Sequence, residues 1–177
     1  MCIRDRPKSV DLTLVVPPWN FPTAIPAGGV LAGLAAGSAV IFKPATITAR
    51  TGALIAEIMW DAGVPKEVLK LVKVVDRAAG KLLISHPEVD RLILTGGYET
   101  AELFRSWRDD LPLFGETSGK NSIIVTPNAD IDLAVKDVVY SAFGHAGQKC
   151  SAGSTVILVG SVAQSERFRR QLIDSVS

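Results

Sequence analysis

The sequence predicts an α/β fold, a Rossmann-like open parallel sheet with helices on both faces. Short apolar runs, most of them rich in β-branched residues, alternate along the chain with longer helical segments. The runs are nearly continuously apolar, as parallel strands are when helices cover both faces of their sheet. Unusual motifs follow several of these runs directly, at the carboxyl ends of strands, where open α/β sheets bind ligands.

The strands are predicted from six apolar runs, at residues 12–16, 39–42, 68–75, 92–95, 122–126 and 155–159. Another apolar run, at 111–114, leads to Glu116. The helices are predicted from six longer segments, at 25–36, 48–62, 76–85, 99–108, 131–142 and 164–176. Gly37 and Gly63 follow the first two segments, as glycine commonly does at a helix end. Asp130 is expected to cap the fifth helix.

Composition excludes several classes of protein. The 177 residues are 47% hydrophobic, enough for a substantial core. With 19 basic and 18 acidic side chains the net charge is +1, which argues against a nucleic-acid binder. Two cysteines, Cys2 and Cys150, cannot form a disulfide framework, so we expect a reducing, cytoplasmic setting.

Two segments of the sequence could be mistaken for a membrane span or a signal peptide. Residues 12–42 carry no charge, but prolines crowd the first half, so we expect buried strands and a buried helix rather than a membrane span. Residues 1–10 show neither a structural pattern nor the apolar region of a signal peptide. We therefore expect them to be a leader outside the fold.

Cys150 lies in the polar sequence GQKCS, at residues 147–151. A lone cysteine is commonly a buried structural thiol, whereas small and polar neighbours favour an exposed nucleophile. Both interpretations stay open on the local sequence. A thiol nucleophile needs a base. Glu116 is one candidate for this base, or else a solvated carboxylate. His145 is another candidate, or else a packing residue.

Other polar residues follow the predicted strands. Asn20 lies between Trp19 and Phe21, which we expect to be buried, and its amide could donate to an oxyanion or stabilise a turn. Lys43 could contact a hydroxyl or a phosphate, or be a solvated strand end. Gly96 and Gly97 precede a helix whose N-terminal amides could face a phosphate. Neither GxGxxG nor GxxxxGK[ST] occurs.

Together the motifs PWNFP (18–22), KPA (43–45), TG (95–96), ETSGK (116–120) and GQKC (147–150), in this order and spacing, resemble the aldehyde dehydrogenase superfamily. The resemblance covers the chain from about Asp11 onward. It implies an incomplete aldehyde dehydrogenase fold, with an NAD(P)-binding domain at 11–115 and the start of a catalytic domain at 116–177. The whole enzyme would be much longer, and we expect the isolated fragment to be inactive.

The resemblance implies a role for each matching residue. Cys150 matches the catalytic thiolate, Asn20 the oxyanion donor and Glu116 the base that activates water. Lys43 matches the lysine at the adenine ribose, and no metal is implied. The cofactor cleft would be formed by Pro18, Trp19, Lys43, Ala45, Thr46, Gly63, Thr95, Gly96, Gly97, Thr100 and Thr117.

Two departures bear on the cofactor, for which the resemblance implies NAD. The family commonly has serine at Gly97, so a hydroxyl is missing there. Many NAD-preferring members have glutamate at Thr46, where it repels a 2′-phosphate. Its absence leaves NADP open.

The sequences ETSGKN (116–121) and CSA (150–152) look like those of L-glutamate γ-semialdehyde dehydrogenases, also called 1-pyrroline-5-carboxylate dehydrogenases, of proline catabolism. Ser151 would then contact the substrate carboxylate. The parent protein would be a homo-oligomer, possibly fused to a proline dehydrogenase. The alternatives are another semialdehyde dehydrogenase, an enzyme that acylates coenzyme A or reduces an acyl phosphate, and an inactive nucleotide-binding fragment. Glu116 argues against the coenzyme A and acyl-phosphate readings.

Overall fold

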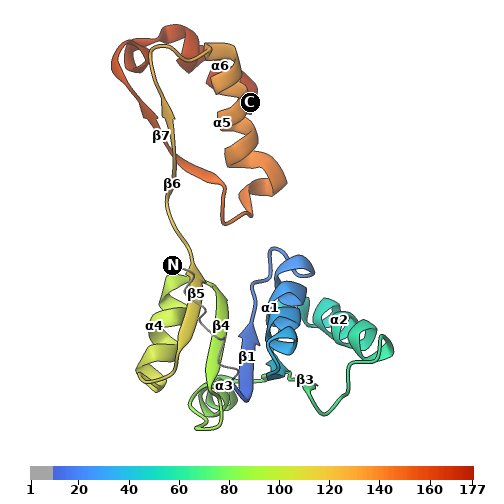
Figure 1. Cartoon of the computed structure of the whole chain (residues 1–177). Coiled ribbons are helices and arrows are strands. Elements are labelled where there is room, and N and C mark those ends of the chain that lie inside the picture. The colour runs from blue at the N-terminus through green and yellow to red at the C-terminus, as the bar shows by residue number, and fades with distance from the viewer. Residues whose placement is uncertain (1–9) are drawn as a thin grey trace, which may run out of the picture. The chain divides into compact units, whose positions relative to one another are not determined.

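The computed structural model describes residues 10–177. The chain folds as two compact units that divide between Thr117 and Ser118. The predicted leader at 1–10 falls almost wholly outside the described residues. The elements of the first unit, shown in Figure 1, are β1 (Leu12–Val16), α1 (Ala24–Ala35), β2 (Ala39–Phe42), α2 (Ala49–Asp61), β3 (Leu69–Leu71), α3 (Arg77–Ile84), β4 (Arg91–Gly96), α4 (Tyr98–Trp107) and β5 (Leu113–Thr117).

The first unit contains a five-stranded sheet in the order β3-β2-β1-β4-β5, and every pair of neighbours is parallel. The chain builds outward from β1 to β3 on one side and then returns to place β4 on the other side of β1. The pair β1 and β4 is therefore the topological switch point of the sheet. This arrangement confirms the predicted open parallel sheet.

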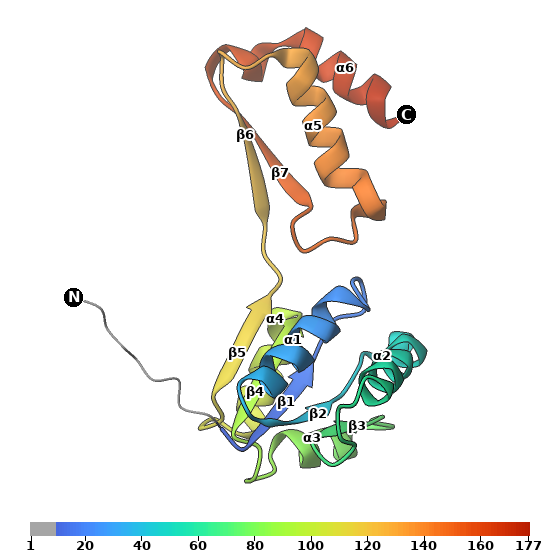
Figure 2. The same ribbon diagram turned by 45° about the vertical axis from the view of Figure 1, so that its right-hand side comes forward.

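Helices cover both faces of this sheet (Figure 2). On one face, Leu14 and Leu92 pack with residues of α3 and α4 such as Ile84 and Phe104. On the other face, alternate strand residues pack with α1 and α2 in a second cluster: Val15, Val30, Val40, Phe42, Ile55, Ala56, Met59 and Leu69. The period of two along each strand thus distributes the apolar residues between two cores.

Two glycines bring α1 unusually close to the sheet. A Cβ atom at Gly29 would lie 2.9 Å from Cγ1 of Val15, and one at Gly33 would lie 2.8 Å from Cγ2 of Val40. The two glycines are four residues apart, so they occupy the same face of the helix. Larger residues would push α1 outward, together with the loop that connects it to β1.

The second unit is built around a two-stranded parallel sheet. Its elements are β6 (Asn121–Val125), α5 (Ile131–Phe143), β7 (Gly153–Leu158) and α6 (Glu166–Val176). Helix α5 connects the strands, and the Asp130 carboxylate caps it by accepting from the amides of Asp132 and Leu133, as predicted. The core comprises Val125, Val135, Val162 and Phe168.

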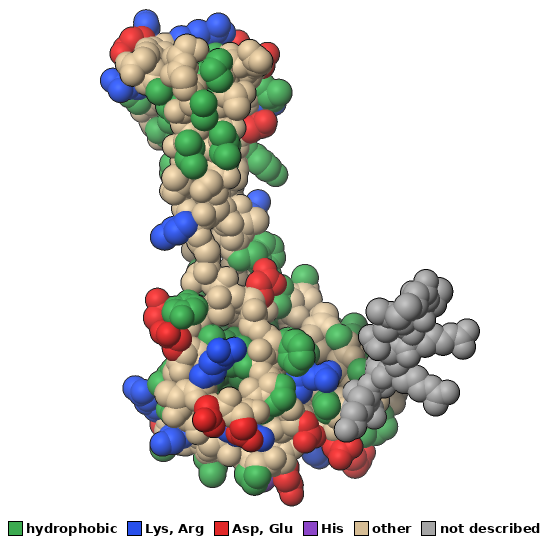
Figure 3. Space-filling model, turned by 60° about the vertical axis from the view of Figure 1, so that its left-hand side comes forward, with side chains coloured by type: hydrophobic (Ala, Val, Ile, Leu, Met, Phe, Trp, Pro, Cys, Tyr) green, Lys and Arg blue, Asp and Glu red, His purple; other side chains and the backbone are tan. Residues whose placement is uncertain are grey.

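Other hydrophobic side chains of the second unit are exposed. Ile124 on β6 is 63% exposed and Ile157 on β7 is 44% exposed. Figure 3 shows hydrophobic atoms at the surface, with acidic and basic side chains interspersed between them. Neither sign of charge dominates this face, in keeping with the balanced composition.

Each predicted helix is present within two residues at either end, but two strands differ from expectation. The third strand is only Leu69–Leu71 rather than 68–75, because its partner β2 ends at Phe42 and the last bond runs from the Val72 amide to the Phe42 carbonyl. Strand β5 is absent from the six predicted strands and is expected only as the apolar run 111–114, with Glu116 at a strand end, whereas it spans Leu113–Thr117. Pro112, Gly115 and Glu116 have low strand propensity, and pairing with β4 supplies the order.

No helix within residues 10–177 is both long enough and apolar enough to span a lipid bilayer.

Candidate active site

Three loops meet at the carboxyl edge of the five-stranded sheet. They follow β1, β2 and β4, and because these strands are parallel neighbours their carboxyl ends share one edge. The structure therefore brings together at this edge most of the residues predicted for the cofactor and the oxyanion: Pro18, Trp19, Asn20, Lys43, Ala45, Thr46, Thr95, Gly96, Gly97 and Thr100.

In the loop after β1, Asn20 and Phe21 are both half-buried. Trp19 is 45% exposed, so the expectation that it is buried is wrong. The strand's burial ends at Pro17, after which the chain bends through a turn to reach α1. An indole and an amide at the sheet edge are thus both accessible to a ligand.

Lys43 follows β2 directly and is half-buried. Burial removes water from its ammonium group and lowers the pKa of Lys43 below its ordinary value. No carboxylate among residues 10–177 forms an ion pair with it. A partly dehydrated ammonium of this kind favours a hydroxyl or anionic oxygen from a ligand.

Helix α4 begins immediately after β4, and its N-cap is Gly97. No side chain caps this helix, and the Gly97 carbonyl accepts from the amides of Thr100 and Ala101 at 3.1 and 3.4 Å. The N–H groups of Tyr98 and Glu99 have no partner one turn back within the helix. Helix N-termini of this type bind phosphate. The donor set at this edge, amides and an ammonium, therefore fits a dinucleotide.

Glu116 lies on β5, an edge strand, and its side chain is exposed. It pairs with Thr95, whereas Leu113 on β5 pairs with Leu92 of the α3–α4 core. Since strand residues alternate between faces, Glu116 and Thr95 lie on the opposite face, which α1 and α2 cover. The Glu116 carboxylate is thus on the same face as the helix that follows the Asn20 loop.

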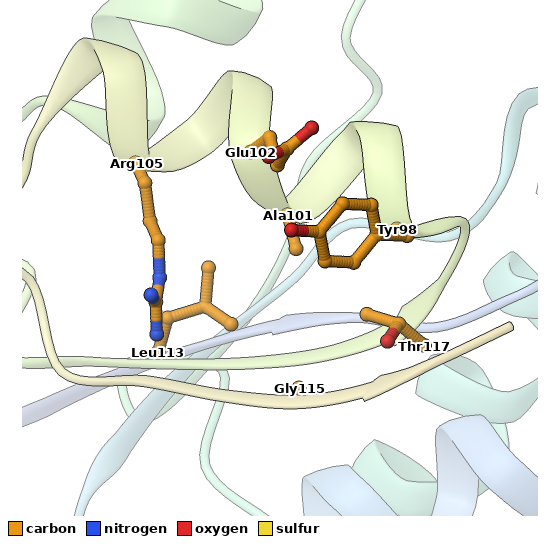
Figure 4. Close-up of a pocket in the computed structure, with 7 residues that line it drawn as sticks. All are labelled: Tyr98, Ala101, Glu102, Arg105, Leu113, Gly115 and Thr117. Carbon is orange, nitrogen blue, oxygen red and sulfur yellow. The ribbon is translucent and has the colours of Figure 1, made fainter. Parts of the chain in front are cut away.

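A hollow of about 380 Å³ lies between α4 and β5 (Figure 4). Tyr98, Glu102 and Arg105 line it from the helix, and Leu113 and Thr117 line it from the strand. A hydrogen bond to Glu102, together with its negative charge, raises the pKa of Tyr98. Of the predicted site residues only Thr117 lines this hollow, which places Thr117 on the face opposite Glu116.

Gly63 is not brought together with the other predicted cofactor residues. It follows the C-terminus of α2 with φ of +101°, and its amide donates to the Trp60 carbonyl at 3.0 Å. Helix α2 begins near the carboxyl edge of the sheet and leads back to the start of β3. Gly63 therefore ends a helix at the opposite edge, where its positive φ requires glycine.

Cys150 lies in the second unit, in the connection between α5 and β7, as an exposed free thiol. A turn contains it, closed by a hydrogen bond of 3.1 Å from the Ala152 amide to the Lys149 carbonyl. Ser151 is exposed in the same turn. The exposure contradicts a buried structural thiol, and the nucleophile interpretation stays a prediction. Asn20 and Glu116 belong to the first unit, whereas Cys150 belongs to the second.

The segment before this turn is left-handed. His145, Ala146 and Gly147 have φ values of 57°, 55° and 69°, and the Gln148 amide donates to the His145 carbonyl at 3.1 Å. Left-handed backbone costs a non-glycine residue roughly 1–2 kcal/mol. Lys149 anchors the segment on α5, with Nζ 5.4 Å from the centre of the Tyr140 ring. Strain of this kind clusters at functional sites.

Two side chains that support the Cys150 loop were missed from the sequence. The Asn121 amide donates to the carbonyls of Cys150 and Ala152. The Ser141 hydroxyl accepts from the Gly153 amide at 3.2 Å. Asn121 belongs to the quoted ETSGKN motif, but only tertiary structure shows that its side chain reaches a loop 29 residues away.

The described part of the chain, residues 10–177, contains no group of three His, Cys, Asp or Glu side chains that could hold a metal ion.

Comparisons with known proteins agree with this geometry. The sequence model of the Aldehyde dehydrogenase family matches residues 2–177. The chain belongs to the aldehyde dehydrogenase family. Among curated relatives, 1-pyrroline-5-carboxylate dehydrogenase 1 of Halalkalibacterium halodurans is 36% identical over 157 residues, which cover 84% of this chain and 30% of the relative.

Solved structures of the family are also similar. Proline utilization A from Corynebacterium freiburgense is 53% identical with a TM-score of 0.89, over 95% of this chain and 17% of that one. Betaine aldehyde dehydrogenase from Staphylococcus aureus, solved with NAD+, is 32% identical with a TM-score of 0.89, over 96% of this chain and 34% of that one. The chain thus spans about a third of the length of the curated relatives it matches.

Proposed function

We propose that the protein to which this chain belongs oxidises an aldehyde to a carboxylate with NAD(P), using Cys150 as the nucleophile. The observation that carries the proposal is the exposed thiol of Cys150, held in a hydrogen-bonded turn of an aldehyde dehydrogenase chain. Asn20 and Glu116 lie on loops and strands of the same chain that could supply an oxyanion donor and a base.

The chemistry proceeds through a covalent intermediate on sulfur. The Cys150 thiolate forms a bond to the aldehyde carbon, and the carbonyl electron pair moves to oxygen, where the Asn20 amide and the Cys150 N–H stabilise it. The oxygen electron pair then re-forms the carbonyl as hydrogen leaves carbon with its bonding electrons. A nicotinamide cofactor held by Lys43 and the N-terminus of α4 would supply the acceptor for this hydride. A thioester on Cys150 remains.

Glu116 completes the cycle by removing a proton from water. The water oxygen bonds to the thioester carbon, and the carbon–sulfur bond breaks with its electron pair returning to Cys150. One aldehyde, one NAD(P)+ and one water give one carboxylate, one NAD(P)H and two protons.

Lys43 and the N-terminus of α4 are proposed to hold the cofactor, with NAD as the expected nucleotide and NADP use left open by Thr46. Replacing Lys43 with Met should raise KM for the cofactor roughly 10- to 100-fold, because a charge-assisted hydrogen bond is worth roughly 1.5–3 kcal/mol. Stability should not fall, since the substitution removes a half-buried ammonium. An unchanged KM for the cofactor would remove Lys43 from the site.

The proposed substrate is L-glutamate γ-semialdehyde, in proline catabolism. Two observations support it: curated relatives are named 1-pyrroline-5-carboxylate dehydrogenases, and one similar structure is a proline utilization A. Exposed Ser151 beside Cys150 could donate to the substrate carboxylate. A homo-oligomer, fused or not to a proline dehydrogenase, belongs to the same proposal.

Substrate and mechanism can be tested together in the complete protein. Replacing Cys150 with Ala should lower kcat at least on the order of 10⁴-fold, whereas Ser122→Ala, at an exposed position on β6, should not. Turnover of the semialdehyde should exceed that of aliphatic aldehydes of equal length, and Ser151→Ala should reduce the difference. Full activity of Cys150→Ala would refute covalent catalysis. Equal turnover of both substrates would refute the substrate assignment, and a requirement for coenzyme A would favour an acyl-transferring relative.

A further inference from the structure

Asn121 connects the start of β6 to the loop that carries Cys150. Its Nδ2 donates to the carbonyl oxygen of Cys150 and, at 3.0 Å, to that of Ala152. A carboxamide nitrogen has two hydrogens, so both are used on a single turn. The Ser154 hydroxyl donates in return to the Asn121 carbonyl at 3.4 Å.

A local irregularity in the sheet accompanies this contact. Asn121 pairs with Gly153, but the register shifts between Asn121 and Ser122 before pairing with β7 continues. Such bulges re-aim a side chain relative to a regular strand. Asn121 is half-buried at the junction of the strand and the turn, so its carboxamide faces the same two carbonyl partners at a fixed position.

The peptide groups on both sides of Cys150 are held through their carbonyls. The carbonyl of Lys149, in the preceding peptide group, accepts from the Ala152 amide at 3.1 Å. The carbonyl of Cys150, in the following group, accepts from Asn121. The described backbone has no cis peptide bond, so the N–H of Cys150 points opposite to the Lys149 carbonyl, away from the inside of the turn.

We infer that Asn121 is a positioning residue for the Cys150 nucleophile, because its carboxamide fixes the second of the two peptide planes that flank the nucleophile. With both planes held, the backbone torsions at Cys150 are set, and so are the directions of its Cα–Cβ bond and its N–H. The first carries the attacking sulfur and the second is a proposed oxyanion donor. This inference rests on the proposed function.

Three substitutions in the complete protein separate positioning from folding. Asn121→Asp keeps the shape but replaces the donor with a carboxylate, Asn121→Ser removes both bonds without adding charge, and Asn121→Gln keeps a carboxamide. Asn128→Asp is the matched control, since Asn128 is exposed in the turn before α5. Each variant is assayed for kcat, KM for the cofactor, thermal unfolding, and the rate of Cys150 alkylation by iodoacetamide against pH.

We expect Asn121→Ser to lower kcat roughly 10- to 100-fold, the scale of an ångström-sized misplacement, with KM for the cofactor changed less than about twofold. Asn121→Asp should lower kcat similarly and also shift the alkylation profile to higher pH, because a carboxylate placed against the backbone carbonyl of Cys150 adds negative charge to the turn and disfavours the thiolate. Asn121→Gln should recover part of kcat. Where a variant is partly unfolded, its activity is compared as the amplitude of the initial NAD(P)H burst, divided by the amount of Cys150 that iodoacetamide can alkylate.

The inference is overturned if Asn121→Ser and Asn121→Asp match Asn128→Asp in kcat and in burst per reactive thiol. It is also overturned if kcat falls only in proportion to the loss of folded protein. Cys150→Ala separates the proposed function from the positioning role of Asn121. An active Cys150→Ala protein would remove the proposed function, whereas an inactive one beside a fully active Asn121→Ser would remove only the positioning role.

Discussion

The two sheets of this chain position their polar residues in different ways. In the five-stranded sheet, β1 is buried from Thr13 to Val16 and helices cover both faces. In the two-stranded sheet, no residue of β7 is fully buried. The first sheet places Asn20, Lys43 and Gly97 at one edge through strand order alone. The second places Cys150 through individual hydrogen bonds from Asn121 and within the turn.

The difference shows that a functional group positioned by sheet topology should tolerate substitutions around it better than one positioned by a few local hydrogen bonds. A residue at a sheet edge keeps its place as long as the strands pair. A residue in a loop of the second unit depends on a few bonds, and part of its backbone is left-handed at His145 and Ala146. Substitutions in the two units should therefore differ in size and in kind.

The largest difference is expected between core and surface strand positions. Phe42 on β2 is 0% exposed, and Phe42→Ala should lower the free energy of unfolding by about 3–5 kcal/mol through lost burial and a cavity. Ile157→Ala on β7, 44% exposed, should cost less than about 1 kcal/mol. Urea unfolding of the 177-residue chain, followed by circular dichroism, measures both. Equal costs would break the comparison between the sheets.

A smaller effect is expected at Ala146, where replacement by glycine should raise the free energy of unfolding, whereas the same replacement within a helix lowers it. Glycine relieves the left-handed backbone, so Ala146→Gly should raise the free energy of unfolding of the second unit by up to about 1 kcal/mol. Ala146→Val should lower it by roughly 1–2 kcal/mol. Ala142→Gly, within α5, is the control and should cost about 1 kcal/mol. Amide hydrogen exchange in α5 reports all three. Destabilisation by both glycines would argue against the left-handed turn.

Thr13 offers a test within the core of the first unit. It is 1% exposed, and its hydroxyl has no hydrogen-bond partner among residues 10–177. Thr13→Val should therefore stabilise this unit by about 1 kcal/mol. All three tryptophans of the chain, Trp19, Trp60 and Trp107, lie in this unit, so their fluorescence follows its unfolding. Thr155→Val, at an exposed position on β7, serves as the control, and a destabilised Thr13→Val would contradict the unpaired hydroxyl.

The smallest effect concerns pH and the contact between α5 and α6. Hydrogen bonds from Gln171 and Arg167, at 2.7 and 2.6 Å, lower the pKa of Asp132 below its ordinary value. A lowered folded-state pKa gives stability that is present above about pH 4 and is lost as pH falls through the folded value. Asp132 is exposed, so the effect should be small. The difference in unfolding midpoint between the unsubstituted chain and Asp132→Asn should shrink as the pH falls below about 4, and a constant difference would contradict the linkage.

The sequence predicted the first sheet well because its signal is simple. Apolar runs mark the strands, glycine and proline mark the helix ends, and parallel order brings Asn20, Lys43 and Gly97 to one edge. The full extent of strand β5 could not be predicted, because Pro112, Gly115 and Glu116 have low strand propensity and pairing with β4 stabilises the strand. Gly63 is expected from sequence both to end a helix and to line the cofactor cleft. The structure shows the helix end, and the cofactor contact stays a prediction.

The second unit was predicted in its elements but not in its site. The position of Cys150 between α5 and β7 follows from the pattern of helix and strand. Its hydrogen bonds do not, because Asn121 and Ser141 reach it across the fold from β6 and α5. The left-handed turn could not be predicted from sequence either. Alanine rarely adopts a positive φ, and histidine, although enriched there among non-glycine residues, does so far less often than glycine.

Direct detection of the acyl group on Cys150 tests the central claim. In the complete protein, Glu116→Gln should slow hydrolysis more than hydride transfer, so the thioester should accumulate during turnover. After an acid quench, mass spectrometry of the peptide that contains Cys150 should show the mass of the acyl group, and Cys150→Ala should show none. Production of NAD(P)H without an acyl group on Cys150, or with the group on another residue, would contradict the proposed mechanism.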